Sequence, residues 1–202
     1  MDAITVTEGA ETFTCNAYLV DGERTVLVDA GAMDGVEDVI AEHVDALDAV
    51  ALTHQHGDHV GALDTVLDAF DPELWAYGDH PRRTDALGDG DWVGIGDEEF
   101  EVVYTPGHAD DHVAFVSEST IFSGDVVVHD DGAFEDGSFG RTDMAGQSRE
   151  ELIESIERIL DRLPEGVEGM YAGHGGTFHG DVRAVIERAL ERAERREPKY
   201  PE

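Results

Sequence analysis

Short apolar runs alternate along the first third of the chain with stretches in which apolar residues recur at helical spacing. The runs of strand length predict β-strands at residues 13–20, 25–29 and 49–54. Asp21-Gly22 provides a turn between the first two strands. Helices are expected after Asp34, which could cap the first of them, and from near His59.

The middle of the chain is richer in predicted strands, and its end is richer in predicted helix. Apolar runs predict strands at residues 73–77, 100–105, 112–117, 120–127 and 169–172. Residues 128–147 have no clear period and many glycines, which predicts a long loop. Helices are expected from Ser148, which has capping-box spacing with Glu151, to Pro164, and over residues 181–196. This mixture predicts a layered α/β domain, with residues 1–202 forming one domain.

The charge of the chain restricts its partners. Among its 202 residues, 47 are acidic and 13 are basic, which gives a formal net charge of −34. Such a surface repels phosphates, so binding of nucleic acid is disfavoured, as is attachment to an anionic membrane. We therefore expect a small-molecule substrate as the partner. The sequence pattern carries no signal for the oligomeric state.

The basic residues are themselves unevenly distributed between the two types. Arginine accounts for 12 of the 13 and Lys199 for the other. An acidic, lysine-poor surface is what we expect of a cytoplasmic protein of a halophilic organism, because molar salt shortens the screening length to about 3 Å. The first residues lack the basic start and apolar core of a secretory signal, and no apolar run approaches the roughly 18 residues of a membrane span. Cys15 is the one cysteine, and we expect it to be a small core residue.

The segment THQHGDH, residues 53–59, concentrates groups that bind metals. It follows an apolar strand and contains His54, His56, Asp58 and His59. Imidazole and carboxylate donors without thiolate suit zinc, iron or manganese. A solvated polar loop does not account for so many histidines within six residues.

Three further donors follow predicted strands in the same way. They are His108 in TPGH, Asp125 in FSGD and His174 in AGHG. Together with residues 53–59 they give five histidines and two aspartates, which is enough for two metal ions. Each of these strand-end donors would be a weak signal alone.

The motif H-x-H-x-D-H at residues 54–59, followed by His108, Asp125 and His174, resembles that of the metallo-β-lactamase superfamily. The resemblance extends from about residue 13 to residue 178. It implies a four-layer αββα sandwich with metals at one edge. The FSGD strand and residues 137–146 (GSFGRTDMAG) further resemble the glyoxalase II-like, or hydroxyacylglutathione hydrolase-like, branch, which hydrolyses thioesters of a small thiol carrier.

The resemblance also implies a role for each donor. It implies that His54, His56 and His108 bind the first metal and that Asp58, His59 and His174 bind the second, with Asp125 bridging both. Asp58 and Asp125 are thus the carboxylates assigned to catalysis. Asp29, at the end of VLVD, matches a position that orients a ligand imidazole by a hydrogen bond.

This resemblance implies a metal-dependent hydrolase with two divalent ions, zinc first and iron or manganese as alternatives. Two cations roughly 3.5–4 Å apart lower the pKa of a bridging water, and the resulting hydroxide attacks a thioester or ester carbonyl. A protein nucleophile is then unnecessary, which agrees with the lack of a Ser-His-Asp or Cys-His set in the sequence.

Two features depart from the glyoxalase II-like pattern, namely His112 and the C-terminal end, and the role of Arg141 is open. His112 in PGHADDH stands where small residues often occur in that branch, and the run is closer to a mitochondrial β-lactamase-like branch with endoribonuclease activity. His112 is therefore either a supporting or substrate-contacting residue, or a polar residue at a strand start. Arg141 in the glycine-rich loop could meet a substrate carboxylate or form a surface ion pair. The family's C-terminal helical domain, which binds glutathione, has no counterpart after residues 181–196, so glutathione is in doubt as the carrier.

Several function classes therefore remain open. A dinuclear thioester or ester hydrolase ranks first. A β-lactamase-like endoribonuclease ranks second, because the charge of −34 opposes it and molar salt weakens that opposition. A mononuclear-iron persulfide dioxygenase ranks third, and a non-catalytic metal-binding module ranks last.

Overall fold

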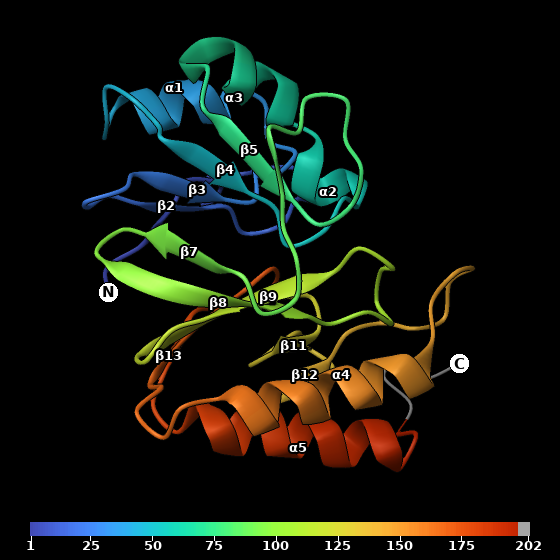
Figure 1. The fold of residues 1–202 in the computed structure, drawn as a ribbon. Helices are drawn as coiled ribbons and strands as arrows, with labels where there is room; N and C mark the ends of the chain where they lie inside the picture. The colour runs from blue at the N-terminus through green and yellow to red at the C-terminus, as the bar shows by residue number, and fades with distance from the viewer. Residues whose placement is uncertain (198–202) are drawn as a thin grey trace.

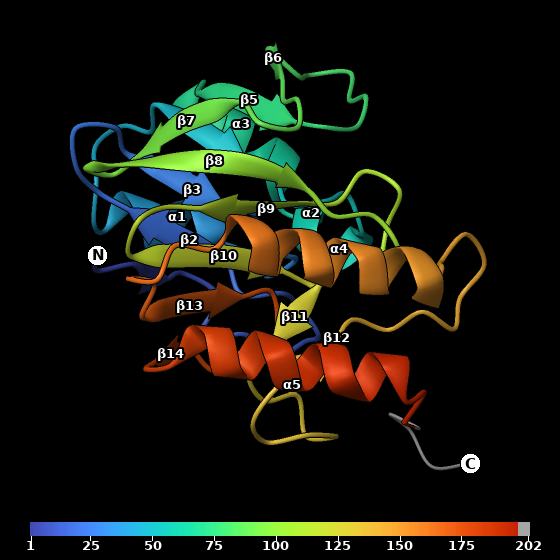
Figure 2. The same ribbon diagram turned by 60° about the horizontal axis from the view of Figure 1, so that its bottom comes forward.

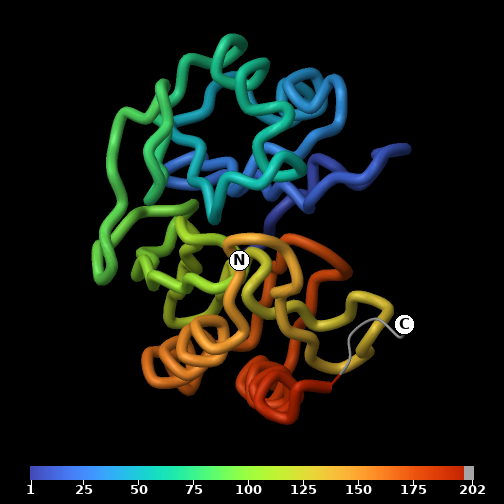
Figure 3. Tube along the Cα trace, turned by 90° about the vertical axis from the view of Figure 1, so that its right-hand side faces the viewer, coloured from blue at the N-terminus to red at the C-terminus, as the bar shows by residue number. Residues whose placement is uncertain are grey.

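Two mixed β-sheets lie face to face between two groups of helices in the computed structural model, which describes residues 1–197 (Figure 1). Helices α1 and α3 cover the outer face of the first sheet, and α4 and α5 cover the outer face of the second. The four-layer αββα architecture expected from the sequence is confirmed. Figure 3 shows that the first part of the chain builds one half of the molecule and the remainder builds the other.

The first sheet has six strands in chain order. Its first three strands are antiparallel, whereas β3, β4, β5 and β6 run parallel. The strands are β1 (Ile4–Thr5), β2 (Tyr18–Val20), β3 (Val26–Val28), β4 (Ala49–Ala51), β5 (Glu73–Ala76) and β6 (Asp85–Ala86). The helices of this half are α1 (Val36–Ala41), α2 (Gly57–Val60) and α3 (Leu63–Phe70).

The second sheet also has six strands, in the order β14-β13-β10-β9-β8-β7, with β10 and β13 parallel and the other neighbours antiparallel (Figure 2). These strands are β7 (Trp92–Ile95), β8 (Glu98–Tyr104), β9 (Val113–Val116), β10 (Thr120–Gly124), β13 (Gly169–Ala172) and β14 (Phe178–His179). A small ribbon is formed by β11 (Val127–Val128) and β12 (Ser138–Phe139). The helices are α4 (Arg149–Arg162) and α5 (Val182–Glu194).

The apolar core is divided by the two sheets into three clusters. One lies between the sheets, and its aromatic members are Tyr18, Trp75, Phe100, Phe115, Phe122 and Tyr171. The other two lie between each sheet and its helices. Because both faces of the central strands are buried, β2, β3, β4, β9 and β10 consist of fully buried residues, which accounts for their continuous apolar runs.

Strand direction brings the predicted donors to one edge of the sandwich. The parallel strands β3 and β4 end before Asp29 and His54, respectively. In the other sheet β8, β10 and β13 share a direction and end before His108, Asp125 and His174. The carboxyl ends of strands that share a direction meet at the same edge, so the site is a consequence of topology.

The strand predicted at residues 13–20 is shorter in the structure. Only Tyr18–Val20 belongs to a strand, because the backbone before it is bonded to loops. Cys15 N–H donates to the carbonyl oxygen of Asp58 at 3.1 Å, and Asn16 N–H donates to that of Gly173 at 2.7 Å. This segment therefore ties the two loops that carry predicted metal ligands.

Two helix predictions in the first half need correction. Asp34 does not cap the first helix, since Gly35 occupies the N-cap position in a left-handed conformation without a side-chain cap. The helix expected from near His59 is divided into α2 and α3 around Gly61 and Ala62. Gly61 keeps helical dihedrals, whereas Ala62 departs from them with φ −95° and ψ 3°, so the break falls at Ala62.

The strand predicted at residues 120–127 ends at Gly124 and resumes as β11. Gly124 has a φ of +50°, and a Cβ there would lie 2.5 Å from His112 Nε2. The predicted loop over residues 128–147 contains β12, which pairs with β11. The strands β1, β6, β7 and β14 were not predicted; β1, β6 and β14 have only two residues each, and β7 is four residues long with a glycine inside it.

The C-terminal helices agree closely with the sequence. Ser148 Oγ accepts a hydrogen bond from Glu151 N–H at 3.2 Å, so the predicted N-cap of α4 is confirmed. Asp181 caps α5 in the same way through Ala184 N–H at 3.0 Å. Among the helices of residues 1–197, none is long and apolar enough to cross a membrane.

Candidate metal centre

Three imidazoles from two loops converge on one point. His56 Nδ1 lies 3.1 Å from His54 Nε2 and 2.9 Å from His108 Nε2. His54 and His108 are buried, and His56 is half-buried. Three ring nitrogens that meet at these distances form a potential tridentate metal site, hereafter the first triad.

A second triad is formed by Asp58, His59 and His174. Asp58 Oδ2 lies 3.1 Å from His174 Nε2 and 3.9 Å from His59 Nε2. His59 is fully buried, whereas the other two are half-buried. Helix α2 therefore contributes Asp58 and His59 to this triad, and the loop after β13 contributes His174.

Asp125 lies between the two triads. Its Oδ1 is 3.4 Å from His59 Nε2, and its Oδ2 is 3.4 Å from both His108 Nε2 and His174 Nε2. The two oxygens of one carboxylate thus face donors of both triads. This is the position that a bridging ligand would occupy.

The rings of His54, His59 and His108 each turn Nε2 toward the centre and have a hydrogen-bond partner at Nδ1. His59 Nδ1 donates to Asp29 Oδ2 at 2.9 Å, and His108 Nδ1 donates to the carbonyl oxygen of Arg141 at 3.1 Å. Thr53 Oγ1 donates to Asp29 Oδ2 at 2.7 Å and lies 3.1 Å from His54 Nδ1, from which it accepts. These contacts place the protons of the neutral rings on Nδ1 and leave Nε2 available for a metal.

His112 is completely buried and supports Asp125 through the backbone. Asp125 N–H donates to His112 Nε2 at 3.0 Å, and His112 Nδ1 lies 2.7 Å from Thr105 Oγ1. An imidazole that accepts at one nitrogen and donates at the other is neutral, and burial holds the pKa of His112 well below its usual value. Its contacts are with the protein, and it is absent from the cavity wall.

Burial and charge separate the pKa values of the two triads. Burial lowers the pKa of His54 well below its usual value and that of His108 to about 4. Burial opposes the charged form of His174 too, but the carboxylates of Asp125 and Asp58 outweigh it and raise its pKa to about 9. Burial likewise opposes the charged form of His59, yet Asp29 and Asp125 keep its pKa well above the usual value.

The donor set fits divalent metal ions. His59 Nε2 and Asp125 Oδ1 are buried and have no hydrogen-bond partner among residues 1–197. Leaving two such atoms unpaired would cost free energy, and a cation between them would satisfy both. Imidazole and carboxylate donors suit zinc, iron and manganese.

A cavity of about 770 Å³ opens onto this centre. Its wall includes His56, Asp58, His108, Asp125 and His174, together with residues of the loop after β11. Arg141 is also in the wall, and its guanidinium contacts both oxygens of Asp143 at 2.8 and 3.0 Å. The cavity is of the size that small-molecule sites commonly have.

Comparison with known proteins agrees with this geometry. A profile described as the metallo-β-lactamase superfamily matches residues 10–92, which include Asp29 and the donors at 54–59. The chain belongs to the metallo-β-lactamase superfamily. The remaining donors of this superfamily member, His108, Asp125 and His174, lie beyond the matched segment.

Relatives of this superfamily member resemble it in sequence and in fold. A hydroxyacylglutathione hydrolase of Aliivibrio fischeri (strain MJ11) is 33% identical over 153 residues, covering 74% of this chain and 56% of the relative. The match thus spans little more than half of that relative. ETHE1 from Myxococcus xanthus shares the fold, with a TM-score of 0.73 and 24% identity over 98% of this chain and 91% of that one. TTHA1623, in a di-iron-bound form, has a TM-score of 0.71 and 27% identity over 94% and 98% of the two chains.

Several residues of the site were not identified from the sequence. Asn16 Nδ2 donates to the carbonyl oxygens of Ala172 and Gly175 at 3.0 and 2.8 Å, which fixes the turn that carries His174. A Cβ at Gly173 would lie 2.1 Å from Asp125 Oδ1. Cys15 is buried as predicted, but beside Asp29 and His59, and burial raises the pKa of its thiol to about 11. The glycine pair around His174 in AGHG was the one signal available for this turn.

Proposed function

We propose that this superfamily member is a dinuclear metal-dependent hydrolase of a small thioester or ester. The observation that supports this most strongly is the position of Asp125, whose Oδ2 lies 3.4 Å from a histidine of each triad and whose Oδ1 faces His59 of the second triad. A carboxylate held in this way, with one buried oxygen lacking a partner, suits two cations better than one.

In this proposal His54, His56 and His108 hold one ion, and Asp58, His59 and His174 hold the other. Asp125 bridges them. Zinc is proposed first, and iron or manganese suits the same donors. Two such ions, when bound, lower the pKa of a shared water and polarise a carbonyl group.

The protein's own residues orient the donors and limit access of water. Asp29 and the Arg141 carbonyl hold the Nδ1 protons of His59 and His108, so that each Nε2 faces the centre. His112 holds the Asp125 backbone from the buried side. His56 and His174 both line the cavity, so a substrate carbonyl bound there could reach the centre.

The choice of thioesters rests on the sequence relatives. The hydroxyacylglutathione hydrolase of Aliivibrio fischeri is named for a thioester substrate, and the alignment with it covers 74% of this chain. TTHA1623, described in a di-iron-bound form, supports a centre that holds two metals. The thiol carrier of the present protein is a separate question, considered below.

A panel assay tests this function. Zinc-, iron- and manganese-loaded protein should hydrolyse S-acyl thioesters, and His54→Ala should lower kcat/KM by more than about a hundredfold, beyond the loss that a supporting residue causes. Asp125→Ala should be worse than either His54→Ala or His174→Ala, because it removes a contact from both triads. His43→Ala, at an exposed position away from the cavity, is the matched control.

The same panel separates the other function classes. Cleavage of structured RNA without thioester turnover would favour the endoribonuclease, although the charge of −34 opposes it. One iron per chain with oxygen uptake on a persulfide would favour the dioxygenase. Wild-type thioester turnover in His54→Ala would contradict the proposed first metal site.

A further inference from the structure

The cavity at the metal centre has apolar side chains on its rim. Among residues 1–197, four large apolar side chains are exposed, namely Ile4, Phe13, Trp92 and Met144. Two of them, Phe13 and Met144, line this cavity. On a surface so rich in carboxylates, exposed apolar groups that gather at a cavity indicate contact with an apolar ligand.

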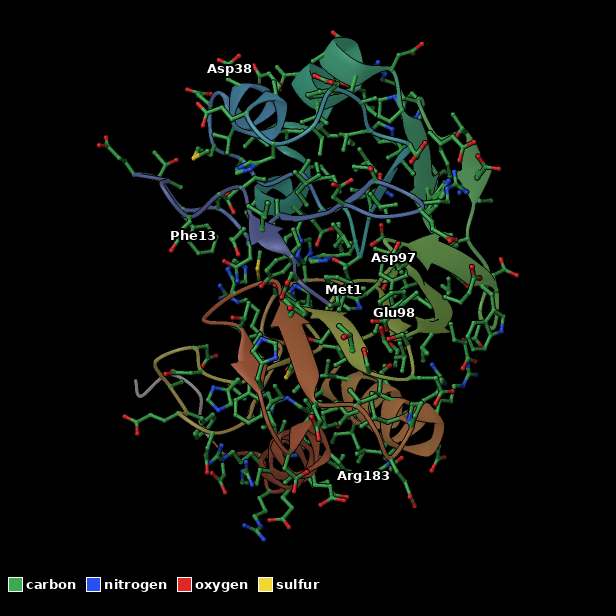
Figure 4. All side chains as sticks on the ribbon, turned by 90° about the vertical axis from the view of Figure 1, so that its left-hand side faces the viewer. Met1, Phe13, Asp38, Asp97, Glu98 and Arg183 are labelled. Carbon is green, nitrogen blue, oxygen red and sulfur yellow. The ribbon has the colours of Figure 1, made fainter. Side chains whose placement is uncertain are left out.

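Phe13 flanks the second triad. Its side chain is 78% exposed, and its ring stacks on the His174 imidazole with centroids 5.2 Å apart and planes 19° apart. Figure 4 shows Phe13 at the margin of the molecule, at the level where the two halves meet. One face of the ring is thus covered by a proposed metal ligand, and the exposed remainder can contact a bound molecule.

Met144 flanks the first triad. It is 55% exposed, and its backbone N–H donates to Gln147 Oε1 at 3.0 Å. Gln147 Nε2 in turn donates to the carbonyl oxygen of His108 at 2.9 Å. The segment that carries Met144 is therefore tied to the loop that carries His108, and both residues belong to the same cavity wall.

The charged residues of the cavity wall do not suit an anionic carrier. Apart from the proposed ligands, the wall contains Asp130, Asp131 and Arg141. The Arg141 guanidinium is already held by both oxygens of Asp143, so a substrate carboxylate would have to compete with that pair. A neutral ligand meets no such competition and no repulsion from Asp130 and Asp131.

We propose that Phe13 and Met144 bind an apolar, uncharged portion of the thioester substrate. These two contacts thereby determine which substrate chain lengths the enzyme prefers. This inference rests on the proposed hydrolase function and specifies the substrate class of the same site. Thioether contacts of methionine and the face of a phenyl ring both adapt to alkyl chains of different length.

Two homologous series of thioesters test the proposal. One series varies the acyl group from acetyl to hexanoyl in thioesters of the neutral thiol N-acetylcysteamine. The other series keeps the acetyl group and lengthens the alkyl chain of the thiol, giving S-alkyl thioacetates. In the wild type, kcat/KM should rise by about two- to fourfold per methylene in at least one series, as expected for partial to full burial of each group. With the same acyl group, the N-acetylcysteamine ester should exceed the glutathione ester in kcat/KM.

Variants distinguish apolar contact from indirect damage to His174. Phe13→Ala and Met144→Ala should flatten the dependence on chain length, whereas damage to His174 alone would lower turnover of short and long substrates equally. Phe13→Leu should retain much of the dependence. Trp92→Ala, which removes an exposed aromatic side chain outside this cavity, should leave it unchanged.

Binding of uncleavable thioethers, with a methylene in place of the carbonyl, keeps the two proposals separable. Calorimetry should give a dissociation constant that falls with chain length in the wild type and responds to Phe13→Ala. Binding that depends on chain length without any thioester turnover would overturn the proposed hydrolase function. It would still support apolar contact at Phe13 and Met144. If kcat/KM is independent of chain length in the wild type, Phe13→Ala and Met144→Ala alike, the proposed apolar contact would be overturned. A preference for the glutathione ester over the N-acetylcysteamine ester would overturn it too.

Discussion

At the scale of single residues, the centre depends on groups that hold each donor from behind. Asp29, the Arg141 carbonyl and His112 contact His59, His108 and the Asp125 backbone, respectively. None of the three contacts requires a metal, so the orientation of the donors is built into the protein. Such partners commonly change metal affinity by about ten- to a hundredfold.

Gly173 gives the sharpest test of how closely these residues pack. A Cβ there would lie 2.1 Å from Asp125 Oδ1 and 2.8 Å from His59 Cε1. Gly173→Ala should therefore displace both donors and weaken binding of the second metal by about a hundredfold or more. Gly176→Ala is the matched control, since nothing lies within 4 Å of a Cβ at that position. Equal metal affinity in the two variants would contradict this geometry.

The pKa values predict that the two triads respond differently to pH. In the metal-free protein His59 and His174 have raised pKa values, about 9 for His174, so they carry protons at neutral pH. A metal must displace those protons, and its affinity for the second triad falls as pH falls below about 9. His54 and His108 have lowered pKa values, so protons compete little at the first triad.

Metal content after dialysis at about pH 6 and about pH 8.5 measures this difference. We expect one ion to be lost first on acidification, and His174→Ala to reduce the proton release that calorimetry detects on loading, with the His59 proton remaining. Loss of both ions over the same pH range would contradict the assignment.

At the scale of elements, the segment before β2 connects the two halves of the site. Cys15 N–H bonds to the α2 residue Asp58, and Asn16 bonds to the turn after β13 through both its backbone and its side chain. One short piece of chain therefore sets the distance between the loops of the second triad. This arrangement is why residues 13–17 do not continue the strand.

Asn16→Ala tests that connection. Loss of the two side-chain hydrogen bonds to Ala172 and Gly175 should loosen the His174 turn and weaken the second metal by about tenfold, with the first metal unaffected. Titration of metal-free protein with zinc measures both constants. Thr25→Ala, which removes a side-chain hydrogen bond to Asp21 in the turn before β3, is the control. Equal losses in both variants would indicate general destabilisation instead.

The sequence predicted which metal donors follow which strands. It did not predict the long-range contacts that hold those donors in place. The donors could be found because each follows an apolar run, and a strand end is recognisable from local pattern. The contact of Asn16 with Gly175 joins residues 159 positions apart, and no local pattern encodes it. Gly124 interrupts a predicted strand where His112 occupies the space of a Cβ, which is also a tertiary effect.

At the scale of the whole molecule, the net charge of −34 opposes folding through repulsion among the carboxylates. Most arginines form exposed ion pairs, such as Arg24 with Glu73 and Arg82 with Asp68. Exposed pairs contribute at most about 1 kcal/mol each, so they cannot offset the repulsion among the remaining carboxylates. We propose on this basis that the protein is adapted to concentrated salt.

Stability should therefore rise with ionic strength. Screening acts over about 10 Å at 0.1 M salt and about 3 Å at 1 M, so the repulsion between neighbouring carboxylates falls steeply over this range. Circular dichroism and thermal melting of metal-loaded protein should show loss of structure on dialysis into dilute buffer. Sucrose at equal concentration, which does not screen charge, is the control. An unchanged melting temperature in dilute buffer would refute the proposal.

In the proposed centre, one protein chain binds two metal ions around Asp125. Native mass spectrometry of protein loaded with zinc counts those ions directly, under conditions that retain the fold. We predict two zinc ions per chain in the wild type and fewer than two in Asp125→Ala. Saturation of the wild type at a single ion, or two tightly bound ions in Asp125→Ala, would contradict a two-metal centre held by Asp125.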